Sequence, residues 1–129
     1  PTLLAIAGLP SPSAPVDGES LAPLLKQTGA LSRRAIFWHY PHYHPGGATP
    51  YSAIREGDFR LVEFFEDNRV ELYNLKDDIG ETQNLAAAMP DKAADLRQKL
   101  HNWRVRVGAQ MPTANPAFDP AKDQAKRKK

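Results

Sequence analysis

Three of the four histidines of this 129-residue chain stand within six residues, in the segment His39-Tyr-Pro-His42-Tyr-His44. Imidazole can bind a metal, exchange hydrogen bonds or, when protonated, attract an anion. The H-x2-H-x-H spacing could supply three ligands to zinc, but a zinc site also needs a rigid frame and a fourth ligand or water. The segment contains no Asp or Glu. Three interpretations therefore stay open: a metal site, aromatic packing in a loop, or contact with an anionic substrate.

A second polar group follows later in the chain, where Asp77, Asp78 and Glu81 precede Asn84. Oxygen ligands of this kind suit calcium. Asx turns use the same residue types and are much commoner than loops with the regular ligand spacing of a calcium site. That frequency favours a structural role for this segment.

Arginines at positions 55, 60 and 69 fall in or beside expected strands, and an alternating basic face could attract anionic sugars or nucleic acid. Acidic residues interleave with them and cancel that field. Cross-strand ion pairs are therefore the better account. The acidic residues are Glu56, Asp58, Glu63, Glu66 and Glu71.

The net charge of +2 belongs to the end of the chain. Residues 121–129 contain five basic residues and one acidic residue, which leaves a net charge of −2 for residues 1–120. The basic run Lys126–Lys129 could touch nucleic acid or acidic lipid, but a solvated terminus is the simpler account. No apolar run approaches the ~20 residues of a membrane span. Neither nucleic acid nor membrane is expected as a partner.

The chain has no cysteine, which excludes disulfides, thiolate metal sites and a cysteine nucleophile within it. The compartment cannot be read from this feature. The 41% hydrophobic and 25% charged residues are scattered through each other, as in a single globular domain.

Strand-forming residues dominate the segments around the histidines. Turn residues at 57–58 and 66–69 separate three of these segments, which predicts an antiparallel meander. Residues 41–50 carry three prolines and two glycines and are predicted to form a loop. The expected strands are Ala35–Tyr40, Tyr51–Glu56, Phe59–Phe65 and Val70–Leu75.

A long helix is predicted over Pro90–Val107, with Pro90 at its first position and Gly108 at its end. An apolar stripe runs along it at helical spacing and must bury against the sheet. The stripe comprises Ala93, Leu96, Leu100, Trp103 and Val107, and Arg104 is placed off it. Trp38, Trp103 and the pair Phe64-Phe65 are expected in the core.

The N-terminal segment is expected to hold a short helix over residues 2–7, ended by Gly8, a proline-rich loop, and a helix over Leu21–Lys26 capped by Ser20. Residues 111–129 are expected to be an extended, disordered tail. The predicted fold class is α+β: about four antiparallel strands packed against a C-terminal helix, with an N-terminal helical arm.

The run from Val70 to Leu85 resembles the C-terminal subdomain of type I sulfatases, the arylsulfatase family of the alkaline-phosphatase-like superfamily. The string E-L-Y-N-L-x-D-D-x-x-E-x-x-N-L carries the resemblance. Blocks in the family's order surround it, and the resemblance covers roughly residues 1–120. These blocks are Pro1–Leu4, Asp17–Leu25, Ala35–Tyr40, Ile54–Val62 and Ala93–Trp103.

The resemblance implies a parent enzyme that hydrolyses sulfate esters. In the family, a Cys or Ser in C/S-x-P-x-R becomes a formylglycine nucleophile, and a divalent cation, usually calcium, assists it. Only Ser13-Ala-Pro15-Val-Asp17 approaches that motif, and its Asp would repel a sulfate. We therefore expect no catalytic residue and no metal ligand in this chain, and expect the chain alone to be inactive. Its partner would be the missing N-terminal catalytic domain.

The same resemblance places His39, His42 and His44 beside the mouth of the sulfate-ester cleft, as substrate-binding residues for a sulfated small molecule or glycan. It implies three parts: residues 1–34 as the tail of the catalytic domain, 35–110 as the subdomain, and 111–129 as the tail. Family members are commonly periplasmic or secreted, but the localisation of this protein stays unknown.

Two alternatives remain from the sequence. One is a free-standing module that binds anionic glycans, and the other is the C-terminal part of a phosphonate or phosphodiester hydrolase of the same superfamily. If a catalytic domain is missing, the face that meets it could be exposed as an apolar patch.

Overall fold

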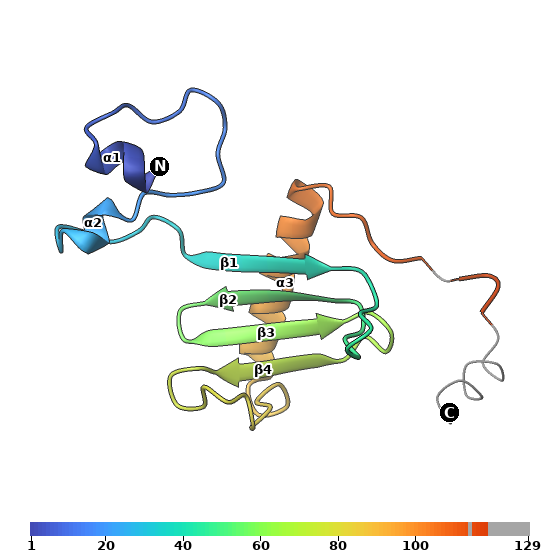
Figure 1. Ribbon diagram of the computed structural model, residues 1–129. Coiled ribbons are helices and arrows are strands. Elements are labelled where there is room, and N and C mark those ends of the chain that lie inside the picture. The colour runs from blue at the N-terminus through green and yellow to red at the C-terminus, as the bar shows by residue number, and fades with distance from the viewer. Residues whose placement is uncertain (114, 119–129) are drawn as a thin grey trace.

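The computed structural model describes residues 1–113 and 115–118, and shows a four-stranded sheet crossed on one face by a long helix (Figure 1). The strands pair in sequence order and every pair is antiparallel, so the predicted meander and the predicted α+β fold are confirmed. The expected disordered tail lies mostly outside the described residues. The main elements are β1 (Ala35–Tyr40), β2 (Tyr51–Glu56), β3 (Phe59–Phe64), β4 (Val70–Asn74) and α3 (Pro90–Arg106).

Two tight turns set the register of the central strands. Gly57, between β2 and β3, has φ of +60°, and Asn68, between β3 and β4, has φ of +56°. Both residue types tolerate this left-handed region, which most residues avoid. The resulting register places Leu61 opposite both Ile54 and Leu72, so an apolar row crosses three strands.

The core lies between this row and α3. Ala93, Leu96 and Leu100 of the helix are buried against the row, and the last two are fully buried. At the β1 side, the rings of Phe37 and Trp103 stack with centroids 4.9 Å apart. Val107 was predicted on the buried stripe but is 52% exposed, because α3 ends one residue earlier.

Arg104, and not Val107, is the last buried residue of the helix stripe, with an exposure of 8%. Its Nη1 lies 2.7 Å from Oε2 of Glu63 on β3, and the two side chains form a buried ion pair. Arg97 donates a 2.7 Å hydrogen bond from Nε to the other carboxylate oxygen. Burial raises the pKa of Glu63, but these two guanidiniums outweigh it and hold that pKa below its usual value.

The prediction of cross-strand ion pairs is therefore wrong for two of the acidic residues. Glu63 pairs with α3, and so does Glu56, whose carboxylate lies 2.6 Å from Nζ of Lys99 and 3.8 Å from Nζ of Lys92. Both carboxylates lie on the helix-covered face of the sheet, where the basic residues of α3 are nearer than the strand arginines.

The N-terminal arm comprises α1 (Thr2–Ile6) and α2 (Ala22–Leu25), which pack against each other and not against the sheet. Gly8, with φ of +70°, follows α1 as the sequence predicted. The predicted cap of α2 is wrong by one residue: Leu21 is the N-cap, while Ser20 Oγ still accepts the N–H of Ala22 at 3.2 Å. Figure 1 shows the arm beyond β1.

The face of the sheet opposite α3 has no covering element among the described residues (Figure 1). Trp38, which was expected in the core, lies on this face and is 43% exposed. In the same part of the chain, no helix is long and apolar enough to cross a bilayer.

Candidate functional site

His39 lies near the end of β1 and is held at both ring nitrogens. Nδ1 is 2.7 Å from Oγ of Ser52, and Nε2 is 2.7 Å from the carbonyl oxygen of Gln110. Because a carbonyl oxygen only accepts, Nε2 carries a proton, and in the neutral ring Nδ1 accepts the Ser52 hydroxyl proton. His39 therefore clasps β1 and β2 to the segment that follows α3.

The buried polar residues beside this clasp resemble a nucleophile with its base, because Ser52 stands opposite Glu63 in the register of β2 and β3. Their surroundings exclude that chemistry. Ser52 is fully buried, so its hydroxyl is closed to a substrate, and Glu63 is held by two arginines of α3. The group is a structural polar network at the rim of the core.

His42 and His44 lie in the loop between β1 and β2, and both are exposed. The loop has a defined turn: His44 donates its N–H to the carbonyl of Ala48 and accepts the N–H of Gly47, each at 2.9 Å. His44 Nδ1 accepts the N–H of Gly46 at 2.9 Å, which fixes the ring and leaves Nε2 toward solvent. The His42 ring packs edge-on against Tyr40.

The three histidines do not converge on a common point. His39 turns toward the end of α3, and no group of three metal-binding side chains exists anywhere in residues 1–113 and 115–118. Of the chemistries left open by the sequence, the geometry leaves His42 and His44 available for hydrogen bonds or charge contacts with a ligand.

The acidic segment after β4 was the other candidate for a metal, and its oxygens already have partners. Asp78 accepts the N–H of Gln83 at 2.9 Å and the hydroxyl of Thr82 at 3.0 Å. The hydrogen bond from the Gln83 N–H is the main cause that lowers the pKa of Asp78. Asp77 accepts the Asn74 amide at 2.6 Å, and Glu81 pairs with Arg60. These residues do not fit a calcium site.

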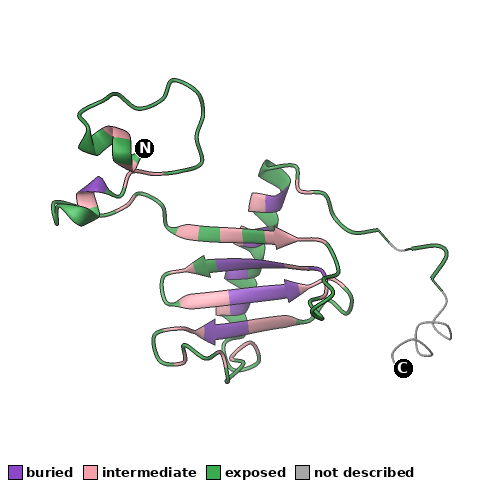
Figure 2. Cartoon of the chain, in the orientation of Figure 1, coloured by how far each residue is buried: buried purple, intermediate pink, exposed green. Residues whose placement is uncertain are grey.

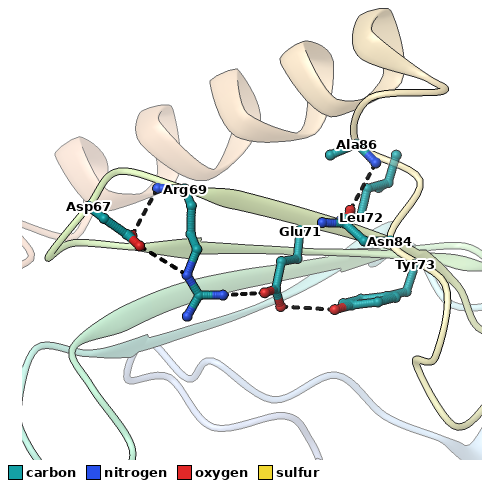
Figure 3. Close-up of polar contacts among 7 residues, drawn as sticks. All are labelled: Asp67, Arg69, Glu71, Leu72, Tyr73, Asn84 and Ala86. Atoms are coloured by element: carbon teal, nitrogen blue, oxygen red, sulfur yellow. Dashed lines mark hydrogen bonds and ion pairs between the residues drawn. The ribbon is translucent and has the colours of Figure 1, made fainter.

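Asn84 joins this segment to the sheet (Figure 3). Its Oδ1 accepts the N–H of Leu72 at 3.0 Å and the N–H of Ala86 at 2.9 Å, while Leu85 donates its N–H to the Leu72 carbonyl at 2.7 Å. The asparagine thus extends the edge of β4 and starts the turn that leads to α3, which is the structural role favoured by the sequence.

Charged residues on the uncovered face form a second chain of contacts, also visible in Figure 3. Arg69 contacts both Asp67 and Glu71, and Glu71 accepts a 2.9 Å hydrogen bond from the Tyr73 hydroxyl. Burial, and then the Glu71 carboxylate, raise the pKa of Tyr73 to about 12. Arg69 therefore forms ion pairs, but with residues two positions away along the chain and not across the strands, so the cross-strand prediction is wrong here too.

An open cavity of about 320 Å³ lies on the uncovered face, between the histidine-bearing loop and the ends of the strands. Its charged lining residues are already engaged with one another, as the pairs Arg60–Glu81 and Arg69–Glu71 show. The lining comprises Gly47, Ala48, Thr49, Tyr51, Arg60, Val62, Phe64, Arg69, Glu71 and Glu81.

A meander of four strands backed by one helix, with a structured histidine loop at one end, defines an α+β subdomain. The family model described as N-sulphoglucosamine sulphohydrolase, C-terminal, matches residues 1–107. The chain belongs to this family of C-terminal sulfatase domains.

The relatives are sulfatases. A sulfatase of Formosa agariphila is 38% identical over 84% of this chain and 22% of its own length, and human arylsulfatase A is 32% identical over 88% and 26%. A solved structure of a protein in complex with its substrate D-glucosamine-2-N,6-O-disulfate is 31% identical, with a TM-score of 0.68 over 87% of this chain and 24% of that one. The chain spans about a quarter of the length of these relatives.

Proposed function

We propose that this chain is the C-terminal part of an enzyme that hydrolyses sulfate esters, and that the reaction takes place in a portion N-terminal to it. Membership of the C-terminal sulfatase family over residues 1–107 carries the proposal. The hydrogen bonds that Asp77 and Asp78 accept within their own turn, and the complete burial of Ser52, are consistent with chemistry that lies elsewhere in the enzyme.

The proposed division of labour is the one that the family resemblance implies. Residues 35–110 form the subdomain, residues 1–34 continue the catalytic domain, and residues 111–129 are the tail. The formylglycine and the calcium ion that the resemblance implies would both lie in the N-terminal portion. The chain contributes neither, since its acidic segment is used to cap turns.

The proposed substrate-binding residues of this chain are the histidines of the loop. His42 and His44 are exposed and could donate N–H groups to a sulfate oxygen, with added attraction when the rings are protonated. His39 belongs to the same segment, but both of its nitrogens are engaged, so it would fix the base of the loop. The sulfated amino sugar bound by the similar protein supports a sulfated glycan as the substrate class.

The test is turnover by the whole protein that contains this chain. It should release p-nitrophenol from p-nitrophenyl sulfate, and the purified 129-residue chain should not. Hydrolysis of a phosphonate or phosphodiester ester in place of a sulfate ester would overturn the assignment, and so would turnover by the chain alone.

The loop is tested with a sulfated glucosamine as substrate. His42→Ala and His44→Ala should raise KM severalfold while kcat changes less, because the contacts bind substrate without taking part in the chemistry. His101→Ala, on the exposed side of α3, is the matched control. An unchanged KM in both loop variants would show that these histidines do not bind the substrate.

A further inference from the structure

The uncovered face of the sheet carries three rows of side chains, set by the register of the four strands. At one end, aromatic rings form a ladder: Tyr40 and Tyr51 lie 5.9 Å apart, Tyr51 and Phe64 lie 6.3 Å apart, and the Arg69 guanidinium sits 3.6 Å above the Phe64 ring. The middle row is Trp38, Ala53, Val62 and Glu71, and the last row is Ile36, Arg55, Arg60 and Tyr73.

The middle row forms the floor of a shallow trough. Ala53 is fully buried and Val62 is 5% exposed, and Val62 also lines the cavity beside Gly47, Ala48 and Thr49 of the histidine-bearing loop. Each central strand therefore has three consecutive buried residues, one or more on each face. Strands that are apolar on both faces are typical of sheets covered on both sides. Trp38 and Ile36, at 43% and 46% exposure, stand uncovered at the β1 side of this face.

One charge on this face lacks a counterion. Arg55 stands directly opposite Arg60, and like charges in that position repel. Arg60 is compensated by Glu81, whereas the contact of Arg55 is a 3.4 Å approach to the carbonyl of Gly57. The described residues give Arg55 no carboxylate, so a partner that covers this face is expected to bring one.

We propose that this uncovered face is the docking surface for the N-terminal portion of the longer protein, which places apolar side chains against Trp38 and the trough and a carboxylate against Arg55. The inference rests on the proposed function. The relatives extend over about four times the length of this chain, so a covering partner is available within one polypeptide. The apolar arm supports the same partner: Leu3 and Leu25, at 81% and 66% exposure, lie uncovered beyond β1.

A second copy of the chain fits this face less well. The carboxylates that the face itself offers, Glu71 and Glu81, are already paired with Arg69 and Arg60. A face-to-face dimer would therefore bring further guanidinium groups toward Arg55 without a free acidic group on the described part of either face.

Photo-crosslinking in the whole protein tests the contact without disturbing the fold. A p-benzoylphenylalanine placed at Trp38 should crosslink within the same polypeptide to residues upstream of Pro1, as read by mass spectrometry of the tryptic peptides. The same amino acid at Gln98, exposed on the far side of α3, is the control and should give no such link. A link from Trp38 to a second molecule, or none at all, would overturn the inference.

The proposed contact between Arg55 and a carboxylate of the partner is tested by combining the Trp38 crosslinker with substitutions at Arg55. Arg55→Glu should reduce the yield of the upstream crosslink severalfold, whereas Arg55→Lys should retain most of it. Equal crosslink yields in both variants would show that no carboxylate of the partner meets Arg55. Failure of the proposed function is a separate result: a protein that forms the crosslink but hydrolyses no sulfate ester would keep the docking surface and lose the sulfatase assignment.

Discussion

The two faces of the sheet are built from the same four strands and differ in what closes them. On the covered face, α3 buries the row Ile54, Leu61 and Leu72 completely, and basic residues of the helix reach the carboxylates of Glu56 and Glu63 on the strands. Figure 2 shows in purple the buried parts of the central strands and of α3. On the uncovered face, Trp38 and Ile36 are exposed, Tyr40, Tyr51 and Phe64 are half-buried, and Arg55 has no carboxylate among the described residues. The first face is covered by a helix of this chain. The second carries exposed apolar side chains and an arginine without a carboxylate, as expected of a surface that a partner covers.

This difference separates stability from interaction. Contacts on the covered face should determine the free energy of unfolding of the chain itself, because they lose water on folding. Contacts on the uncovered face should matter little until the partner is present. Paired substitutions, one on each face, put this division to a direct test.

The largest difference is expected between two isoleucines on neighbouring strands. Ile54→Ala, at a fully buried site, should lower the free energy of unfolding by about 2–5 kcal/mol, because it leaves a cavity beneath α3. Ile36→Ala, at a site 46% exposed, should cost about 0.5 kcal/mol. Urea denaturation of the 129-residue chain measures both, and similar losses would mean that the two faces are equally closed.

Arginines provide the second pair. Arg104→Leu removes one of two guanidiniums from the buried Glu63 carboxylate and should cost about 3 kcal/mol, at the low end for a broken buried pair because Arg97 remains. Arg69→Leu, on the uncovered face, breaks half-exposed pairs and should cost about 1 kcal/mol or less.

The double variant Glu63→Leu with Arg104→Leu shows whether the loss of stability in Arg104→Leu comes from a buried carboxylate without its partner or from lost packing. It should recover most of the stability, since no buried carboxylate remains. A double variant as unstable as Arg104→Leu alone would show that the arginine acts through packing instead.

The fold was predictable because local signals agreed. Turn residues at Gly57 and Asn68 and the alternation around them located the strands to within one residue. Arg104 was missed although it stands four residues after Leu100 on the same helix stripe, because its charge argued against burial. The sequence could not show that Glu63 faces it from a strand 41 positions earlier. Trp38 was misplaced because β1 is apolar on both faces, and alternation does not tell which face is covered.

The candidate site was less predictable. The three histidines are close in sequence, but the partners of His39 are 13 and 71 residues away, and neither Ser52 nor Gln110 belongs to a recognisable pattern. Only the tertiary fold separates a histidine held at both nitrogens from its two exposed neighbours. Their proposed role in substrate binding remains a prediction.

Two of the histidines differ in the same way, since His39 lies on the covered face and His42 lies in the loop beyond the sheet. His39→Ala should cost about 2 kcal/mol, because it leaves the fully buried Ser52 hydroxyl and the Gln110 carbonyl without their partner. His42→Ala should leave the free energy of unfolding within about 0.5 kcal/mol of the parent. Thermal and urea denaturation of the isolated chain measure both, and an unaffected His39 variant would contradict the clasp.

The smallest expected effect is a pH dependence that comes from Glu63. Its pKa in the folded chain lies below the usual value of 4.5, so folding favours the ionised carboxylate. The stabilisation is fully present above about pH 4.5 and is lost as the pH falls through the lower folded pKa. Glu63→Gln lacks this contribution, so the parent should be the more stable chain at neutral pH and the gap should narrow in acid. Glu71→Gln, from the uncovered face, measures what a half-exposed ion pair adds. A gap between the parent and Glu63→Gln that stays constant from pH 7 to pH 3 would mean that packing, not the ionised carboxylate, makes the covered face stable at this position.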